Sequence, residues 1–377
     1  MANRLTGKPQ LNRFVNRRLI LDRIRRVGEI SRAELAKQTA IRPPTVSVVV
    51  KELIDEGLVE EIGAGETSGG RAPRMLALSG RRLRALGFEV SESAILAGLC
   101  DLNGDLCGQR EVPFKPVTPS EAIDELYSIG SDLLAENGID WSLLEGVGVA
   151  LPGHLSAETG HVRWSTAFNW RDVPLKRLCE ERWGVTTDVV NDSLAGGLAS
   201  HLLDTDTAVD NLVFLYLRFQ DVAPGVVGVG TGIIIRGAAY HGQFGAAGEI
   251  TTPVKHPLAH AADLGRDAPK TLTAFVEALA EAHPAAEAAM ERVATELSTL
   301  VIHVLNLLEP GLLVIGTDTP PLRDWLLERL RTYAQEHGLP HQAGSTQLVA
   351  SSLGKFGVAR GAIVPTLQRV FRIPQWA

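Results

Sequence analysis

Apolar residues in the first sixty positions recur with the period of a helix. Residues 15–27 place valine, leucine and isoleucine at helical spacing among five arginines, and Gly28 is predicted to end that helix. Ser31 has a glutamate three residues later, which is the spacing of a capping box, so a second helix is predicted to begin there. Pro43 suits the first position of a third helix, and Gly57 suits its C-terminal cap.

The third helix has one face for a protein core and another that suits a DNA groove. Its apolar residues recur every three or four positions, which predicts a single buried stripe. The opposite face carries small or basic side chains, as a recognition helix must if its first turn is to meet base edges. Arg42 is a candidate phosphate contact, because a cation at a helix N-terminus is otherwise unfavourable. The candidate DNA-binding residues here are Arg42, Pro44, Thr45, Ser47, Val48 and Lys51. The alternative is a plain helical hairpin with a solvated face.

Two strands, at residues 58–62 and 75–78, are predicted after the third helix, with a glycine-rich loop between them. Three helices followed by such a hairpin make a winged helix-turn-helix. The Gly-Gly-Arg-x-Pro stretch of the loop is expected to present Arg71 to a minor groove. A linker to the next domain is an alternative role for the same loop.

Beyond residue 84 the pattern changes to strands alternating with helices, which predicts α/β layers. The last two of the first three strands flank Asn103-Gly104, a two-residue hairpin signal. Strands are predicted at 85–90, 94–101, 106–112, 146–151, 212–217 and 312–315, and helices at 120–136, 174–183, 193–203, 270–282 and 285–308. With 377 residues, two domains are expected, at 1–80 and 81–377.

The charge of the chain is divided unevenly between these two parts. Residues 1–84 hold 17 Lys and Arg against nine Asp and Glu, a net charge of +8, whereas the remainder carries −15. A basic head on an acidic body indicates that only the head faces a polyanion. A basic but merely solvated face is the alternative.

The composition of the chain indicates the cellular compartment in which the protein works. No apolar run approaches the length of a membrane span, and the N-terminus has no signal-peptide pattern, so a cytoplasmic protein without membrane contact is expected. Cys100, Cys107 and Cys179 are scattered, which argues against a disulfide framework and a cysteine-rich zinc site.

Several segments resemble the ROK family of repressors and sugar kinases. The run ISRAELAKQTAIRPPTVSVVVKELIDEGLVEEIGAGETSGGRAP resembles its DNA-binding head. LPGHLSAETGHVRWSTAFNW, VVNDSLAGGLAS and GIIIRGAAYHGQFGAAGEI resemble the segments around its sugar cleft, and the match extends over essentially the whole chain. The resemblance implies an α/β protein in which the winged helix-turn-helix precedes a two-lobed, actin-like (ribonuclease H-like) sugar-kinase fold with its ligand between the lobes.

The resemblance also implies an effector site. Asp192 falls at the position of the kinases' general base, and Glu249 at that of a glutamate that contacts sugar hydroxyls. Carboxylates and amides suit this task because they pair with hydroxyls that both donate and accept. Taken singly, such residues also serve as caps, and Asp192 would suit the start of a helix near Ser193. The candidate effector-binding residues are Asn169, Asn191, Asp192, Glu249 and Thr252.

Four departures from the family pattern argue against catalysis and metal. Glu89 to Ser93 stand where the kinases carry the phosphate loop D-x-G-G-T. The first residues of the second phosphate-binding segment align with Val226 and Val227. In an alternative alignment, GVGTG at 228–232 matches that segment instead. The family's cysteine cluster is absent, and Thr252 occupies the position of its zinc and sugar histidine. We therefore expect no ATP binding, no kinase activity, no cofactor and no zinc, and we expect His256 and His260 to be surface or loop histidines.

These observations predict a repressor of carbohydrate-metabolism genes that binds a double-stranded DNA operator as a homodimer or tetramer and senses a sugar or sugar derivative. Two alternatives stay open. An active sugar kinase is favoured by Asp192 in its motif and opposed by residues 89–93. A constitutive DNA-binding protein without an effector is favoured by Thr252 and the missing zinc site.

Overall fold

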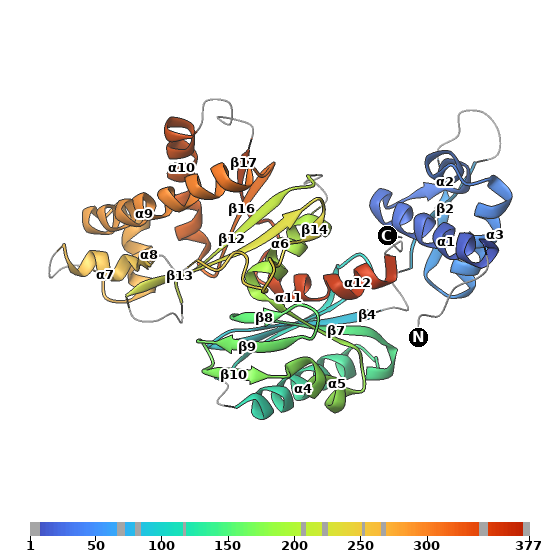
Figure 1. Cartoon of the computed structure of the whole chain (residues 1–377), viewed down its shortest axis with the longest axis horizontal. Helices are drawn as coiled ribbons and strands as arrows, with labels where there is room; N and C mark the ends of the chain where they lie inside the picture. Colours follow the sequence, from blue (N-terminus) through green and yellow to red (C-terminus); the bar gives the residue numbers. More distant parts are fainter. Residues whose placement is uncertain are drawn as a thin grey trace.

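The protein consists of a small helical head and a larger two-lobed body, seen in the computed structural model of Figure 1. The structure describes residues 8–65, 72–79, 84–115, 118–204, 209–220, 225–250, 253–264, 269–338 and 346–371.

The head is a winged helix whose elements follow the predicted order. Ser31 caps the second helix, because its Oγ accepts a hydrogen bond from the amide of Glu34 at 3.2 Å. Gly28 and Gly57 have φ values of 80° and 73°, the left-handed conformation expected where a helix ends. The elements are α1 (Lys8–Val27), β1 (Ile30–Ser31), α2 (Arg32–Thr39), α3 (Pro43–Asp55), β2 (Val59–Ala64) and β3 (Arg74–Leu78), with the strands in the order β1-β3-β2.

The first lobe of the body is a five-stranded sheet covered by two helices. The order β11-β7-β4-β5-β6 places the two parallel pairings at β7, and the remaining pairs are antiparallel. The elements are β4 (Arg84–Val90), β5 (Ala94–Cys100), β6 (Leu106–Pro113), α4 (Pro119–Glu136), β7 (Leu144–Leu151), α5 (Leu175–Trp183) and β11 (Thr187–Asn191). A short sheet of β8 (His154–Ser156), β9 (His161–Ser165) and β10 (Trp170–Val173), which the sequence pattern did not predict, lies beside them.

The connection between β5 and β6 differs from the predicted two-residue hairpin. Cys100 pairs with Leu106, so residues 101–105 form the turn. The Asp101 carboxylate accepts hydrogen bonds from the amides of Asn103 and Asp105 at 2.8 and 3.0 Å. Leu102 is buried in the core, and this burial explains why the turn is longer than Asn103-Gly104 alone predicted.

The second lobe is built on a sheet with the order β14-β13-β12-β16-β17. Helices α9 and α10 pack against it around a core that includes Phe275 and Met290. The elements are β12 (Leu212–Arg218), β13 (Val226–Ile235), β14 (Ala238–Ala239), β15 (Val254–Lys255), α7 (Pro257–Ala262), α8 (Leu272–Ala280), α9 (Pro284–Leu308), β16 (Leu312–Thr317), α10 (Pro320–His337) and β17 (Gln347–Ala350).

Two helices join the lobes, and glycines allow their close approach. α6 (Asp192–Leu202) packs on β13, and α11 (Gly357–Ala362) packs on both β4 and α6. A Cβ on Gly361 would lie 1.9 Å from the carbonyl oxygen of Ala195, so only glycine permits this contact. The lobes therefore meet through backbone packed directly on backbone, which leaves little freedom for the two helices to move independently.

The last helix, α12 (Val364–Phe371), connects the body to the head. Leu367 and Phe371 are 1% and 5% exposed and share one hydrophobic cluster with Ile20, Leu21 and Ile24 of α1. Arg25 of α1 lies 5.4 Å from the centre of the Phe371 ring and donates a hydrogen bond to the carbonyl oxygen of Leu202 at 3.3 Å. The head thus packs on the body through a continuous apolar contact. Between them, β3 ends at Leu78 and β4 begins at Arg84.

Candidate functional site

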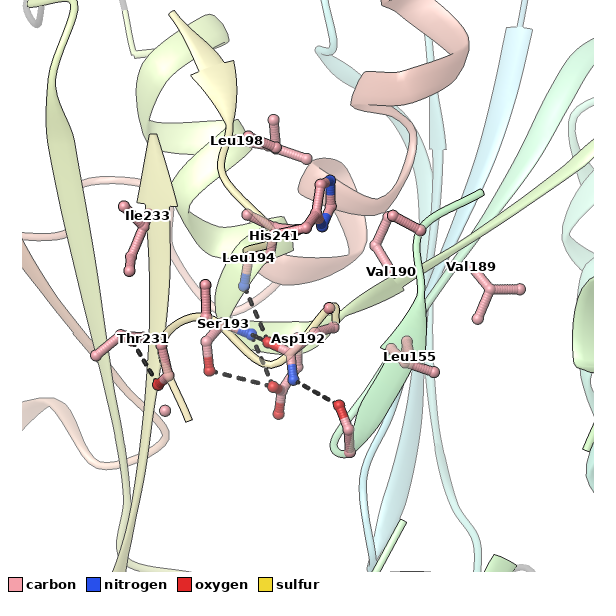
Figure 2. Close-up of a pocket in the computed structure, with 18 of the residues that line it drawn as sticks. Leu155, Val189, Val190, Asp192, Ser193, Leu194, Leu198, Thr231, Ile233 and His241 are labelled. Atoms are coloured by element: carbon pink, nitrogen blue, oxygen red, sulfur yellow. Dashed lines mark hydrogen bonds between the residues drawn. The ribbon is translucent and has the colours of Figure 1, made fainter. Parts of the chain in front are cut away.

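A cleft with a volume of about 330 Å³ lies between the two lobes. Side chains at the end of β11, the start of α6, one face of β13 and the loop 239–249 line it, and α12 closes one side with Pro365 and Gln368. Figure 2 shows Asp192, Ser193 and Thr231 at one part of this cleft. The volume lies in the range of about 300–1,000 Å³ that is typical of small-molecule sites.

Asn191 and Asp192 form the junction between β11 and α6. The Asn191 side-chain oxygen accepts hydrogen bonds from the amides of Ser193 and Leu194 at 3.0 and 3.2 Å, so Asn191 is the N-cap of the helix. Its side-chain nitrogen donates to the carbonyl oxygen of Gly153 at 3.2 Å. Asp192 is the first residue of α6 rather than its cap, and it is 3% exposed. Asn191 therefore fixes the position of the carboxylate that follows it.

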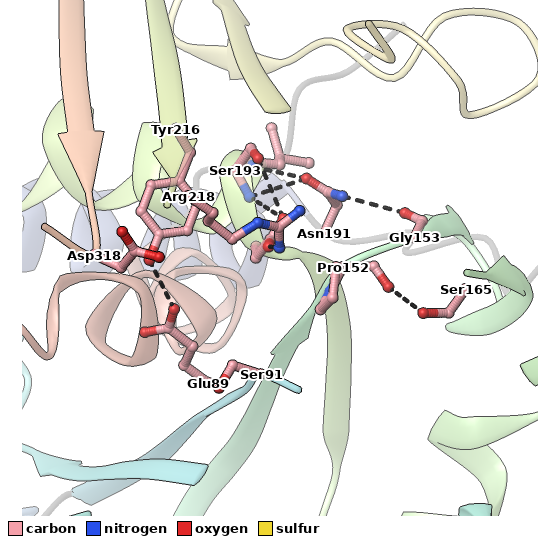
Figure 3. A network of polar contacts seen from close by, with 12 residues as sticks. Glu89, Ser91, Pro152, Gly153, Ser165, Asn191, Ser193, Tyr216, Arg218 and Asp318 are labelled. Atoms are coloured by element: carbon pink, nitrogen blue, oxygen red, sulfur yellow. Dashed lines mark hydrogen bonds and ion pairs between the residues drawn. The ribbon is translucent and has the colours of Figure 1, made fainter. Parts of the chain in front are cut away.

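The Asp192 carboxylate is held by Arg218, the last residue of β12. One carboxylate oxygen, Oδ2, forms an ion pair with the Arg218 guanidinium, and the other accepts hydrogen bonds from the amide and hydroxyl of Ser193 at 2.7 and 3.2 Å. Figure 3 shows the Arg218 side chain extended toward Asn191 and Ser193. Burial acts against the charge of Arg218, but the nearby Asp192 carboxylate raises its pKa. Both oxygens of Asp192 are thus engaged in a neutralised pair.

Glu249 faces this pair from the loop after β14. Thr231 donates a hydrogen bond to the carbonyl oxygen of Gly248 at 2.6 Å, and Glu249 itself pairs with Gly230 as a single β-bridge. A Cβ on Gly248 would lie 2.4 Å from the Thr231 hydroxyl, so the close approach requires glycine. Burial and the negative charge of Asp192 raise the pKa of the Glu249 carboxyl. Two carboxylates and a guanidinium therefore converge on the cleft, and this set can pair with several hydroxyl groups.

A second set of polar contacts lies next to Arg218, around Glu89, Tyr216 and Asp318. Tyr216 donates a hydrogen bond to the buried carboxyl of Glu89 at 3.1 Å (Figure 3). The Asp318 carboxylate accepts hydrogen bonds from the amides of Phe219 and Gln220 at 2.9 to 3.1 Å. Ser91 closes a tight turn with Ala94. The residues at 228–232, GVGTG, lie within strand β13 and pair with β12.

Glu89 gives the stability of the protein a specific pH dependence. Burial, reinforced by repulsion from Asp192, raises the pKa of Glu89 to about 8. Between the ordinary glutamate pKa and pH 8 the folded state therefore binds more protons than the unfolded state, so stability falls as the pH rises. We expect a loss of up to about 1.4 kcal/mol per pH unit from pH 6 to pH 8. Urea unfolding at several pH values measures it.

The matched variant for this test is Glu89→Gln, which keeps an oxygen for the Tyr216 hydroxyl but does not titrate. We expect its stability to lose this part of the slope and to exceed that of the wild type at pH 8. Exchange of the exposed Glu181 for glutamine serves as control and leaves the slope unchanged. Equal slopes in wild type and Glu89→Gln would show that Glu89 is charged at neutral pH.

The structure brings together only part of the predicted effector site. Asn191, Asp192 and Glu249 line the cleft. Asn169 does not: it is exposed, with φ of 53°, in the turn between β9 and β10, where its amide donates to the carbonyl oxygen of Thr166. The motif match predicted Asn169 in the cleft. The structure instead gives a conformational reason for an asparagine in this turn, because Asn adopts the left-handed backbone more readily than most residues. Thr252 lies outside the described residues.

The two histidines expected at the surface are buried. His256 and His260 are 7% and 6% exposed. His256 caps α7 by accepting a hydrogen bond from the amide of Leu258 at 3.2 Å, and His260 lies 3.0 Å from the carboxylate of Glu296. Both therefore have structural partners. Within the described ranges, no group of three His, Cys, Asp or Glu side chains is placed to hold a metal ion.

The face of α3 predicted to meet DNA is open to solvent. Val46, Val49, Val50 and Leu53 are buried on its inner side, which confirms the predicted stripe. On the outer side Arg42, Pro44, Ser47, Val48 and Lys51 are exposed, and Thr45 is half-buried. Arg42 is the N-cap residue of α3 but makes no side-chain capping bond. Among the described residues, no acidic side chain pairs with Arg42 or Lys51. Arg71 lies outside the described residues.

Arg218 was missed by the sequence analysis. It ends an apolar strand, and its partner Asp192 is 26 residues away. A cation withdrawn from water needs an acidic partner, so an arginine directly after an apolar strand was the available signal.

Comparison with known proteins finds a match for each part of the chain. Residues 85–254 match the ROK family and residues 16–67 match the MarR family, in agreement with the predicted resemblance and with the predicted head. A putative xylose repressor from Caldicellulosiruptor sp. is 24% identical over 98% of this chain and its own full length. No helix in the described part of the chain combines the length and apolar character needed to cross a membrane.

Solved structures share the fold. A ROK family transcriptional regulator described as a homologue of the E. coli MLC protein superposes with a TM-score of 0.77 at 20% identity, covering 96% of this chain and 98% of its own. A ROK family glucokinase from Streptomyces griseus, solved with glucose and AMPPNP, gives 0.60 at 19% identity, covering 74% of this chain and 97% of its own. The predicted fold, a winged helix before a two-lobed sugar-kinase-like body, is therefore confirmed.

Proposed function

We propose that this ROK family chain is a transcription regulator that binds an operator through its head and senses a carbohydrate in the cleft of its body. The relatives named as repressors support this role, as does the exposed face of α3. Pro44, Thr45, Ser47, Val48 and Lys51 would face the major groove, Arg42 would contact the phosphate backbone, and Arg71 would lie in the minor groove. A homodimer would place two heads on the half-sites of a palindrome.

The observation that carries the proposal is the position of α12. Pro365 and Gln368 line the cleft, while Leu367 and Phe371 of the same helix pack against the head. An effector that closes the lobes would therefore shift a helix on which the head rests. Packed interfaces tend to move between discrete arrangements rather than deform continuously. In a dimer, such a shift would change the distance between the two recognition helices.

We propose further that the body has no kinase activity. The Asp192 carboxylate is the counterpart of the kinases' general base, but here Arg218 neutralises it and contacts one of its oxygens. The Asp318 carboxylate accepts hydrogen bonds from the amides of Phe219 and Gln220, so these amides are not free to bind a phosphate. The Glu89 to Ser93 turn replaces the glycines that would approach phosphates. An assay that couples ADP release to a sugar panel tests this claim, and sugar-dependent turnover of ATP would favour the kinase alternative.

Glu249→Gln should weaken effector binding by about 10- to 100-fold, because a charge-assisted hydrogen bond to a sugar hydroxyl is worth about 1.5–3 kcal/mol. A thermal-shift screen of monosaccharides, sugar phosphates and amino sugars, followed by calorimetry, supplies the ligand and the affinities. Glu281, an exposed glutamate at the end of α8, provides the matched Glu→Gln control. Equal effector affinity in the two variants would show that Glu249 does not bind the effector. Silence of the wild type across the panel would favour a constitutive regulator.

A further inference from the structure

The cleft continues past its polar residues to a second end that is lined by carbon. Leu194 and Leu198 lie four residues apart on one face of α6, and Ile233 lies on the same face of β13 as Val229 and Thr231. We call Val190, Leu194, Leu198 and Ile233 the apolar wall. Figure 2 shows Leu198, Ile233 and Val190 around His241, on the side of the cleft away from Asp192.

This end of the cleft is poorly suited to a hydroxyl-rich group. Leu198 and Ile233 are 3% and 8% exposed and offer no hydrogen bond. The ring of His241 forms no hydrogen bond with any described residue, and burial lowers its pKa, so it faces the cleft as a neutral imidazole. A hydroxyl placed against the apolar wall would lose its bonds to water and gain few in return. A sugar held by Asp192 and Glu249 must therefore keep its hydroxyls at the other end.

We propose that the effector is a glycoside whose sugar ring binds at Asn191, Asp192 and Glu249 and whose apolar aglycone lies against the apolar wall. The inference deepens the proposed function and rests on it. An aryl group fits the requirement, because the transfer of its ring from water to an apolar surface is favourable. Its ring face can also contact the edge of the His241 imidazole. The continuity of one 330 Å³ cavity from Glu249 to Ile233 allows a single ligand to reach both ends.

The aglycone would also contact the helix that joins body and head. Pro365 of α12 lines the same cavity as Leu198 and Ile233. A bare monosaccharide bound at Glu249 would act on α12 only through lobe closure, whereas an aglycone would press on it directly. The substituent is therefore expected to affect both affinity and the strength of the DNA response.

Pairs of methyl and phenyl glycosides of the same sugar test the inference in the full-length protein. Both anomers of D-xylose, D-glucose, D-galactose and N-acetyl-D-glucosamine are the probes, and calorimetry gives each dissociation constant. For the sugar that binds, we expect the phenyl glycoside to bind at least about tenfold more tightly than the methyl glycoside. Equal affinity, or tighter binding of the methyl glycoside, overturns the inference but leaves a sugar-sensing regulator. Binding of no glycoside in the panel overturns both.

Ile233→Thr locates the effect, with Ile235→Thr as its control. Ile233 lines the cleft, whereas Ile235 ends the same strand, is 37% exposed and does not line it. Ile233→Thr should reduce the phenyl-to-methyl affinity ratio to about threefold or less, while Ile235→Thr should preserve it. Because the readout is a ratio within one variant, a loss of folded protein does not alter it. A ratio unchanged by Ile233→Thr would place the aglycone elsewhere and overturn the inference.

Discussion

Exchanging Arg42 and Lys51 together for glutamate is expected to lower operator affinity by about 100-fold or more at physiological salt. Both side chains are exposed on the outer face of α3 and have no acidic partner among the described residues. Each contact with a phosphate releases a counterion. The proposed homodimer has two Arg42 contacts, so losing both also flattens the slope of log K against log salt by about two. Fluorescence anisotropy with an operator selected from random duplexes measures both quantities.

A matched double charge reversal in the body separates this local effect from net charge. Arg177 and Lys355 are equally exposed, with 61% of each side chain accessible, and lie outside the head. Exchanging both for glutamate changes the net charge identically, and we expect less than about a fivefold loss through the long-range field. If the two double variants lose affinity equally, α3 is not the recognition helix.

Asp192→Ala is expected to destabilise the protein by up to about 3–5 kcal/mol, because it leaves the partly buried Arg218 guanidinium without its counter-ion. Asp192 is 3% exposed and pairs with Arg218 across the junction of α6 and β12. Adding Arg218→Met should restore most of this loss, since an apolar chain of similar length replaces the stranded cation. Urea unfolding of the wild type, both single variants and the double variant gives the coupling free energy.

An exposed ion pair supplies the comparison for this cycle. Arg177 and Glu181 lie four residues apart on α5 with 61% and 57% of their side chains accessible. Their coupling should stay below about 1 kcal/mol, because water screens them. A coupling between Asp192 and Arg218 no larger than this would mean that the cleft does not desolvate the pair. In that case Asp192 would remain available as a base, and the kinase alternative would gain support.

The elements that local chemistry determines were predictable from the sequence. The Ser31 cap, the Pro43 start and the valine stripe of α3 each depend on residues within one or two helical turns. Strands β4 to β6 were also predicted within one residue or so at their ends. The hairpin after β5 was wrong in length because Leu102 is drawn into a core that includes residues from the far C-terminus.

The residues of the cleft were predictable only where a family motif contains them. Asp192 and Glu249 stand in such motifs, but Asn169 does too and lies in an exposed turn. Arg218 and Glu89 acquire their roles only when β12, α6 and β4 converge, and no local pattern reports that convergence. The position of α12 between cleft and head is likewise a tertiary property, which no pattern within the helix reports.

The central claim is that occupation of the cleft changes the affinity of the head for DNA. Its most direct test is operator affinity of the full-length protein, measured by anisotropy with and without a saturating effector from the binding screen. We predict a change of 5- to 150-fold, equivalent to a coupling of about 1–3 kcal/mol, that Glu249→Gln shifts to higher effector concentration. The same operator affinity in the free and saturated protein would contradict the account.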